Sequence, residues 1–169
     1  MERIERTVLS NLIHNEEYTR RVLPFIKEEY FSDRLEKILF SEIYKFVNKY
    51  NGLPSKEALS IEMNGSKSVN EDEYKKVTDI ISTLNPEPVN MDWLRDTTEK
   101  FCKDRAIHNA ILSGIQIIDG KDKQHTPEYL PEMLSNALSV SFDQKVGHDY
   151  LIETKDRFDY YRKKEERLQ

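Results

Sequence analysis

The sequence predicts an all-α protein in which a compact helical head is followed by a long αα-hairpin and a final C-terminal helix. The 169 residues include only 5 glycines and 6 prolines, which disfavours turn-rich β structure. Apolar residues recur at intervals of three and four in most segments, the period of an amphipathic helix. Side chains that cap helices precede several of these segments, so the sequence also marks where helices start.

The composition limits the protein class and its partners. Charged residues make up 34% of the chain and hydrophobic residues 37%, and the mean hydropathy is -0.75. We therefore expect a high ratio of surface to core, as in an elongated or partner-bound chain. A net charge of -5 argues against a domain whose main task is to grip a phosphate backbone. No apolar run reaches the roughly 18 residues that span a membrane, and the N-terminus lacks a signal-peptide pattern, so we expect a soluble intracellular protein.

The N-terminal segment predicts two short helices and an irregular connection. The first helix ends before Asn15, and the second is interrupted at Pro24 because proline lacks a backbone donor and clashes with the preceding turn. The stretch "PFIKEEYF" then supplies apolar anchors to a less regular segment. The helical stripes and anchors are Ile4, Val8, Leu9, Leu12, Ile13, Tyr18, Val22, Leu23, Phe25, Ile26, Tyr30 and Phe31.

Three capped helices complete the predicted head. Asp33 caps the first, which ends at "NGLP", and Ser55 caps a short second one. Asn70 and Glu73 have the spacing of a capping box for the third, which ends at "NPEPVN". The apolar faces are Leu35, Ile38, Leu39, Ile43, Phe46, Val47 and Tyr50 in the first, Ala58, Leu59 and Ile61 in the second, and Tyr74, Val77, Ile80, Ile81 and Leu84 in the third.

The next segment predicts the hairpin. A helix capped by Asn90 runs for about 28 residues, roughly 40 Å, and Gly114 in its middle indicates close helix packing. After the polar tip "DGKDKQH" a second helix restarts at Thr126, with a kink or a late start at Pro131. Its stripe facing the long helix is Leu130, Met133, Leu134, Ala137, Leu138 and Phe142. Beyond the head, one apolar side of the hairpin stays uncovered, and a second copy of the chain is its natural cover.

The last predicted helix begins near Asp149 and has a thin apolar face among charges of mixed sign. Such a helix is either solvated or docks elsewhere through a few aromatic anchors.

Patterns that carry chemistry are missing from the sequence. The stretch "GKDK" fails as a phosphate loop, since Ile115 stands where the first glycine belongs and Asp122 where a Ser or Thr belongs. The four histidines lie in different elements without metal-ligand spacing, and Cys102 lies in an apolar helical run, which favours a buried thiol over a nucleophile. No catalytic, cofactor-binding or metal-binding residue is therefore predicted, and composition and spacing alone indicate a helical interaction domain.

Three passages carry more than a helical period. The stretch from "IERTVLSNLI" to "GLPSKEAL", with "YF" ending its second element, resembles the opening of the DnaB-family replicative helicases, in particular those of the T-even-type phages. "WLRDTTEKFCKDRAIHNAI" is similar to the family's long hairpin helix, with Arg105 and Ala106 near its middle. "ALSVSFDQKVGHDY" is similar to the segment that joins the helical N-terminal domain to the linker helix, and it is the most specific of the three.

The resemblance implies a role in DNA replication. In that family the helical domain forms a collar on a hexamer of ATPase subunits, pairs through its hairpins and docks the primase in the primosome. Residues 1–88 are then expected to be the head, 89–143 the hairpin of the same domain, and 144–169 the linker and the start of the linker helix. The expected oligomer interface is Phe101, Ile111, Ile115, Ile118, Leu130, Leu134 and Leu138, and the expected anchors of the linker helix are Leu151, Phe158 and Tyr161.

The family's ATPase domain, with its P-loop, is absent from this sequence. We therefore expect a truncated, non-enzymatic part of an ATP-dependent DNA-unwinding helicase, with no cofactor of its own and with ATP and Mg bound only by the missing domain. The implied partners are further copies of the chain, primase, a helicase loader and, through the complete protein, single-stranded DNA, with no membrane partner. The implied location is the cytoplasm of an infected bacterial host.

Two other readings remain open at this point. One is a stand-alone helical regulator that binds a replicative helicase or primase, which predicts a gene ending near Gln169. The other is a nucleic-acid binder that uses a basic strip in the last helix, although Glu165 and Glu166 interrupt it. The strip consists of Arg157, Arg162, Lys163, Lys164 and Arg167.

Overall fold

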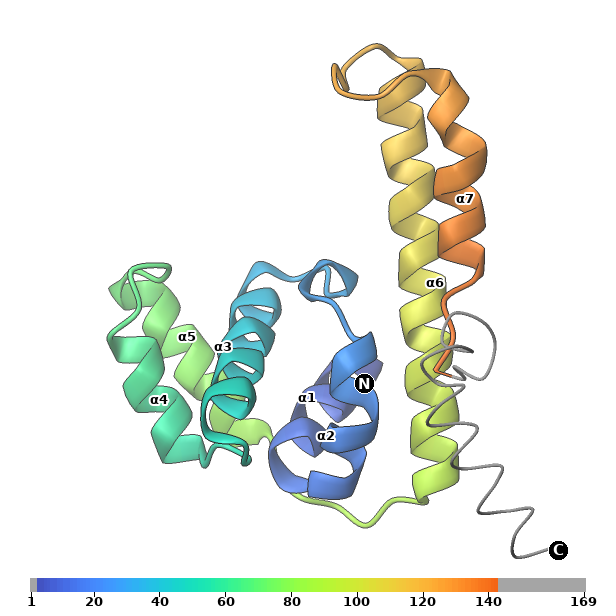
Figure 1. Cartoon of the computed structure of the whole chain (residues 1–169). Coiled ribbons are helices and arrows are strands. Elements are labelled where there is room, and N and C mark those ends of the chain that lie inside the picture. The colour runs from blue at the N-terminus through green and yellow to red at the C-terminus, as the bar shows by residue number, and fades with distance from the viewer. Residues whose placement is uncertain (1–2, 143–169) are drawn as a thin grey trace, which may run out of the picture.

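The computed structural model describes residues 3–142, and over that range the chain is all-α, as predicted. Seven α-helices and three short 3-10 turns occur in this range, and none of its residues belongs to a β-strand. Figure 1 shows a head built from α1 to α5 and, beside it, a hairpin of α6 and α7 that extends past the head. The predicted linker and its anchors Leu151, Phe158 and Tyr161 lie outside the described residues.

The N-terminal part follows the predicted pattern. Helix α1 spans Ile4–His14 and helix α2 spans Glu16–Val22. The side chain of Asn15 caps α2 by accepting a hydrogen bond from the Tyr18 backbone N–H at 3.1 Å. Two 3-10 turns, η1 over Leu23–Phe25 and η2 over Glu28–Tyr30, form the irregular connection predicted after α2.

Helix α3 spans Arg34–Tyr50 and begins at the predicted cap. The Asp33 carboxylate accepts hydrogen bonds from the backbone N–H groups of Leu35 and Glu36, at 2.8 and 3.1 Å. The helix ends at Asn51, whose φ of 55° is left-handed, a conformation that asparagine tolerates better than most residues.

The next two helices are also capped as predicted. Helix α4 spans Lys56–Asn64 with Ser55 as its cap. Helix α5 spans Glu71–Thr83, where Asn70 and Glu73 form the capping box. These caps satisfy backbone N–H groups that a helix start would otherwise leave unpaired.

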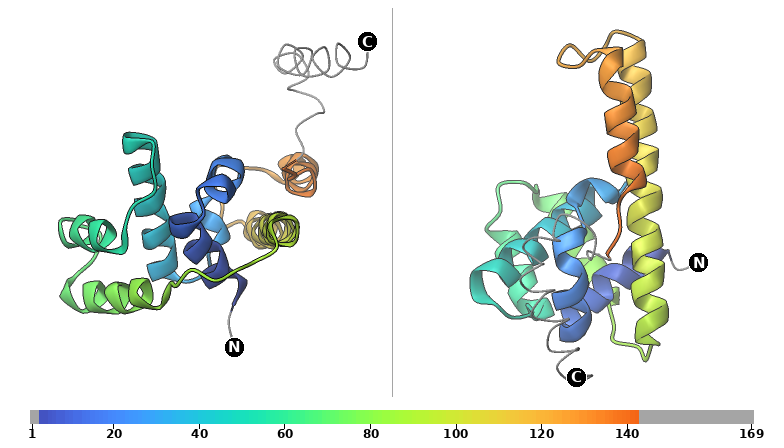
Figure 2. Two further views of the ribbon diagram at one scale, coloured as in Figure 1. Left: turned by 90° about the horizontal axis from the view of Figure 1, so that it is seen from below. Right: turned by 45° about the vertical axis from the view of Figure 1, so that its right-hand side comes forward.

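The hairpin consists of α6 over Met91–Ile118 and α7 over Leu130–Leu138, separated by a polar tip and the 3-10 turn η3 over Pro127–Tyr129. Asn90 caps α6 as predicted. The late start of the second helix is confirmed, because α7 begins at Leu130 with a proline in its first turn. The two helices run side by side and antiparallel (Figure 2).

The core lies in the head and against the first half of α6. It includes Phe31, whose ring stacks on Phe40 at 5.2 Å and meets Phe101 at 5.7 Å between ring centroids. Phe40 on α3 is buried although it was not predicted, because α3 packs against α1, α4 and α5 and so buries more than one stripe. Met63 was not predicted either, and it is buried on α4, which packs against α3 and α5.

Some predicted apolar positions are exposed. Tyr50 at the end of α3 is 53% exposed and Ile61 on α4 is 64% exposed, since neither faces another helix. Leu134 and Leu138 were predicted to face α6, but this expectation is wrong, because they are 37% and 58% exposed. Ala137, which belongs to the same predicted stripe, is buried at 7% exposure, so for this residue the expectation is confirmed.

Candidate interaction face of the hairpin

The first half of α6 is fixed to the head by side-chain hydrogen bonds. The buried hydroxyl groups of Tyr18 and Thr98 lie 2.7 Å apart. Arg105 Nε donates to the backbone oxygen of Tyr30 at 2.9 Å, and Asn109 Nδ2 donates to that of Glu29 at 2.8 Å. Because these bonds join α6 to both α2 and η2, the hairpin has a defined direction relative to the head.

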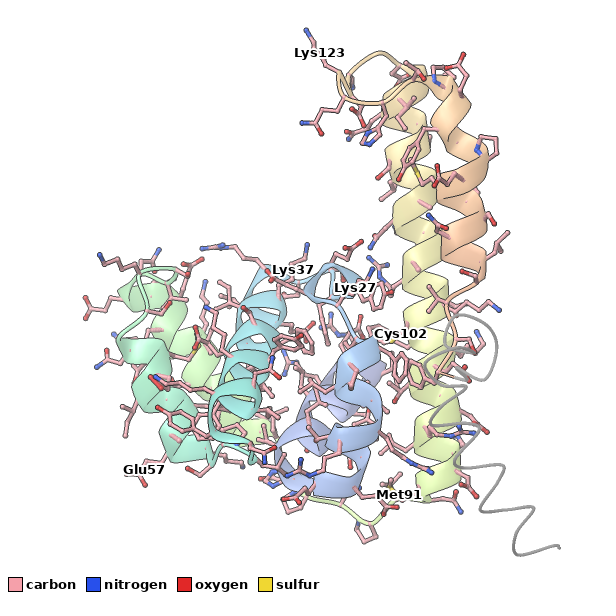
Figure 3. The ribbon with its side chains drawn as sticks, viewed as in Figure 1. Lys27, Lys37, Glu57, Met91, Cys102 and Lys123 are labelled. Atoms are coloured by element: carbon pink, nitrogen blue, oxygen red, sulfur yellow. The ribbon has the colours of Figure 1, made fainter. Side chains whose placement is uncertain are left out.

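The second half of α6 extends beyond the head and packs on α7. Gly114 is buried there, and a Cβ atom at its position would lie 3.2 Å from the Leu130 side chain. The predicted reason for this glycine, close helix packing, is thereby confirmed. Figure 3 marks the two ends of the hairpin, with Met91 at the start of α6 and Lys123 at the outer tip.

The end of α7 returns to the head and is held at two points. The ring of Phe142 stacks on Phe25 with centroids 5.0 Å apart. The Glu99 carboxylate on α6 accepts hydrogen bonds from the Phe142 backbone N–H at 2.7 Å and from the Ser141 hydroxyl at 3.0 Å. Both ends of the hairpin's base are thus attached, and only its outer part lacks a neighbour within the described residues.

Large apolar side chains are exposed on this outer part. Ile111, Ile115 and Ile118 follow one another at helical spacing on α6, and Leu134 and Leu138 do so on α7. Their exposed fractions range from 37% for Leu134 to 68% for Ile118. A soluble chain rarely leaves such a group of aliphatic side chains in water unless the surface has a partner.

Helix geometry places both stripes on the same side of the hairpin. On α6 the three isoleucines are turned by about 40° to 100° from the inward Gly114, at 100° per residue. On α7 the two leucines are turned by about 60° to 100° from the inward Ala137, in the same sense along the chain. In an antiparallel pair, equal turns in the same sense point to the same side. We call the surface formed by Ile111, Ile115, Ile118, Leu134 and Leu138 the lateral apolar face.

The interface residues expected from the sequence therefore separate into three groups. Five of them form the lateral apolar face. Leu130 is half-buried against Gly114, inside the hairpin. Phe101 is only 6% exposed and belongs to the head core beside Phe31, so it does not lie on this face. Leu112, 49% exposed and next to Ile111, was not predicted, although its exposure adds to the apolar surface of α6.

The opposite side of the hairpin is more polar than the lateral apolar face. A groove of about 370 Å³ lies there, lined by residues such as Asn109, Ser113 and Asn136 together with small alanines. At its outer end the His125 ring stacks on Tyr129, and its Nδ1 lies 3.0 Å from the Asp122 carboxylate, a hydrogen bond that lowers the pKa of Asp122. This groove lacks the exposed aliphatic side chains of the lateral apolar face.

The described residues do not assemble a reaction centre. Cys102 is fully buried, and burial raises the pKa of its thiol to about 12, which disfavours the reactive thiolate. Within residues 3–142, no three His, Cys, Asp or Glu side chains are grouped to hold a metal ion. None of the helices in that range combines the length and apolar character that crossing a membrane requires.

Comparison with known proteins gives one informative match. No protein-family model matches the chain. Among curated proteins, the chain is similar to a DnaB-like replicative helicase of Enterobacteria phage T4, with 34% identity over 165 residues, which cover 93% of this chain. The same alignment covers 34% of the helicase, so the chain spans about a third of the length of that relative.

Proposed function

The chain is a relative of the DnaB-family replicative helicases, and on this premise we propose that it is the N-terminal collar domain of a phage helicase, serving oligomerisation and primase docking in DNA replication. The observation that carries the proposal is the extent of the identity, which runs over 93% of this chain but only 34% of the helicase. An alignment of that kind is expected if the chain corresponds to one domain of the longer protein.

Self-association is the first part of the proposed function. The lateral apolar face lies on a hairpin whose base is attached, because α6 is bonded to the head and the chain after α7 is bonded to α6. We assign it to a second copy of the chain, since two such faces related by a two-fold axis cover each other with the same residues. In the complete protein, dimers of this kind would be units of a hexameric ring.

Docking of primase is the second part. A collar that presents rigid helical surfaces away from the ATPase ring supports a partner without taking part in chemistry itself. A helicase loader is a further partner of the same kind. ATP, Mg and single-stranded DNA belong to the complete helicase in this proposal, and its place of action is the cytoplasm of the infected bacterial cell.

Primase docking is tested by mixing this chain with a phage primase and measuring the mass of the species by light scattering after size exclusion. We expect a complex whose mass is the sum of both components at micromolar concentrations. If the chain is folded and self-associated but leaves the primase free at tens of micromolar, primase docking is contradicted and the hairpin interface is not. A dissociation constant of tens of micromolar corresponds to a binding free energy of about 6 kcal/mol.

A further inference from the structure

One ionisable side chain lies in line with the lateral apolar face. His108 is on α6, three residues before Ile111 and seven before Ile115, and it is exposed. Positions with this spacing share one side of a helix, so the imidazole continues the isoleucine stripe toward the base of the hairpin. Leu138 on the antiparallel α7 lies at the same end of the face.

His108 differs from the other histidines in the described range by having no polar partner there. His14 Nε2 lies 2.8 Å from the backbone oxygen of Leu84, and His125 is bonded to Asp122. For His108, residues 3–142 provide neither a hydrogen bond nor an ion pair.

The charged groups around His108 are mostly engaged or belong to other surfaces. Asp104, one turn earlier on α6, bonds Lys100 at 2.7 Å, and Arg105 donates to the backbone of Tyr30. The packed elements contribute Lys27, Glu28, Glu29 and Tyr30 in and beside η2, and Glu128, Tyr129 and Glu132 in η3 and α7. Asp119, four residues after Ile115 at the end of α6, lies at the outer end of the face, far along the helix from His108. Among these groups, Asp104 is the carboxylate one helical turn from the imidazole, and it is already paired.

We propose that His108 makes the self-association of this chain pH-sensitive, with the neutral imidazole admitted into the interface and the imidazolium excluded from it. The proposal rests on the self-association proposed above and adds its regulation. The chemical reason is that a cation transferred from water to an apolar contact without a partner loses hydration and gains nothing in return. A neutral imidazole can be covered by isoleucine and leucine side chains at far lower cost.

The direction of the effect follows from proton linkage. If the dimer favours neutral imidazole, association releases protons, and the dimer is most stable above the ordinary imidazole range near about pH 6.5. As the pH falls through that range, the separated chains become protonated and gain stability relative to the dimer. Two copies of His108 meet in a two-fold dimer, so the dissociation constant is expected to rise by up to about 100-fold for each pH unit below the transition.

The test is sedimentation equilibrium of the full chain between about pH 8 and about pH 5.5, a window above the ordinary carboxylate range. For the wild type we expect the dissociation constant to rise by about 100-fold across this window, with unchanged helix content by circular dichroism. His108→Gln, which cannot be protonated there, should associate equally at both ends. His125→Gln, a matched change at the hairpin tip, should keep the wild-type pH dependence.

The outcomes separate this proposal from the one on which it rests. A wild-type dimer of equal strength at both pH values would overturn the role of His108, as would a pH dependence that persists in His108→Gln. Monomer at every pH and concentration would overturn the hairpin interface itself, and the switch with it. A pH dependence lost only in His125→Gln would move the titrating group to the tip and also contradict the proposal.

Discussion

Glu36 on α3 lies in a site with no exposed surface. Arg3 and Arg6 at the start of α1 both donate to its Oε2 atom, the latter through Nε at 2.6 Å, and the bond to Glu36 raises the pKa of Arg3. Its Oε1 atom is buried without a partner among the described residues. The carboxylate thus joins the first turn of the chain to α3, at a cost in desolvation that two guanidinium groups offset.

Replacing the Glu36 carboxylate tests this link between the start of α1 and α3. Glu36→Gln keeps the volume but removes the charge, so we expect the free energy of unfolding to fall by about 1.5–3 kcal/mol, the range for hydrogen bonds to charged groups. Urea unfolding measures the change, and Glu62→Gln on the exposed side of α4 is the matched control, expected within about 0.5 kcal/mol of wild type. A Glu36→Gln protein as stable as that control would show that the buried ion pair contributes nothing.

Gly114 affects the packing of two elements, because it sets how closely α6 and α7 approach. Glycine inside a helix costs about 1 kcal/mol relative to alanine, while a Cβ there would press on the Leu130 side chain at 3.2 Å. Leu130 is half-buried at the start of α7, so the end of its side chain has room to move by a few tenths of an ångström. The helix preference therefore outweighs the contact for alanine, but not for a larger side chain.

Substitution at this glycine gives a second prediction. Gly114→Ala should raise the free energy of unfolding slightly, by about 0.5 kcal/mol, and Gly114→Leu should lower it by about 1–3 kcal/mol through overpacking. Thermal and urea unfolding of both variants decide the matter. If alanine already destabilises the protein, the two helices are packed too rigidly for Leu130 to yield.

The elements also show how far the sequence was informative. Helix starts were predictable because a capping side chain precedes four of the helices, and each of these side chains accepts the expected backbone hydrogen bond. The capping residues are Asp33, Ser55, Asn70 and Asn90. The coverage of each face was not predictable, since periodicity identifies a stripe but not the helix that covers it. Glu36 is an example. A charged residue is normally expected at the surface, but α1 buries this one.

The candidate site was predicted in the same partial way. The spacing identified the apolar stripes of the hairpin, including Ile115 and Leu138, as interface candidates. It could not separate inward from outward positions, because both occur within one turn of a two-helix hairpin. Phe101 was therefore grouped with the interface although it belongs to the head core. Leu134 was expected both to face α6 and to lie in the oligomer interface.

At the scale of the whole molecule, the head sets the direction of the hairpin. The outer half of the hairpin has an exposed apolar surface on one side and a polar groove on the other. This arrangement explains why the chain is so polar for its size while still exposing isoleucines and leucines in a group. In the proposed function this surface has a use, since self-association requires contacts between identical chains.

The most direct test of the account is the molar mass of this chain by light scattering over a concentration series, compared with Ile115→Gln. Glutamine keeps the helix preference but replaces an apolar contact at the centre of the lateral apolar face. The matched control is Ile61→Gln, which changes an isoleucine that is 64% exposed on α4, away from the hairpin.

We predict that the wild type and Ile61→Gln approach the mass of two 20.1 kDa chains as concentration rises. Ile115→Gln should keep its helix content and associate at least about tenfold more weakly, as expected for the loss of a central apolar contact. A wild-type monomer at every concentration would contradict the account, and so would an Ile115→Gln protein that self-associates as strongly as the wild type.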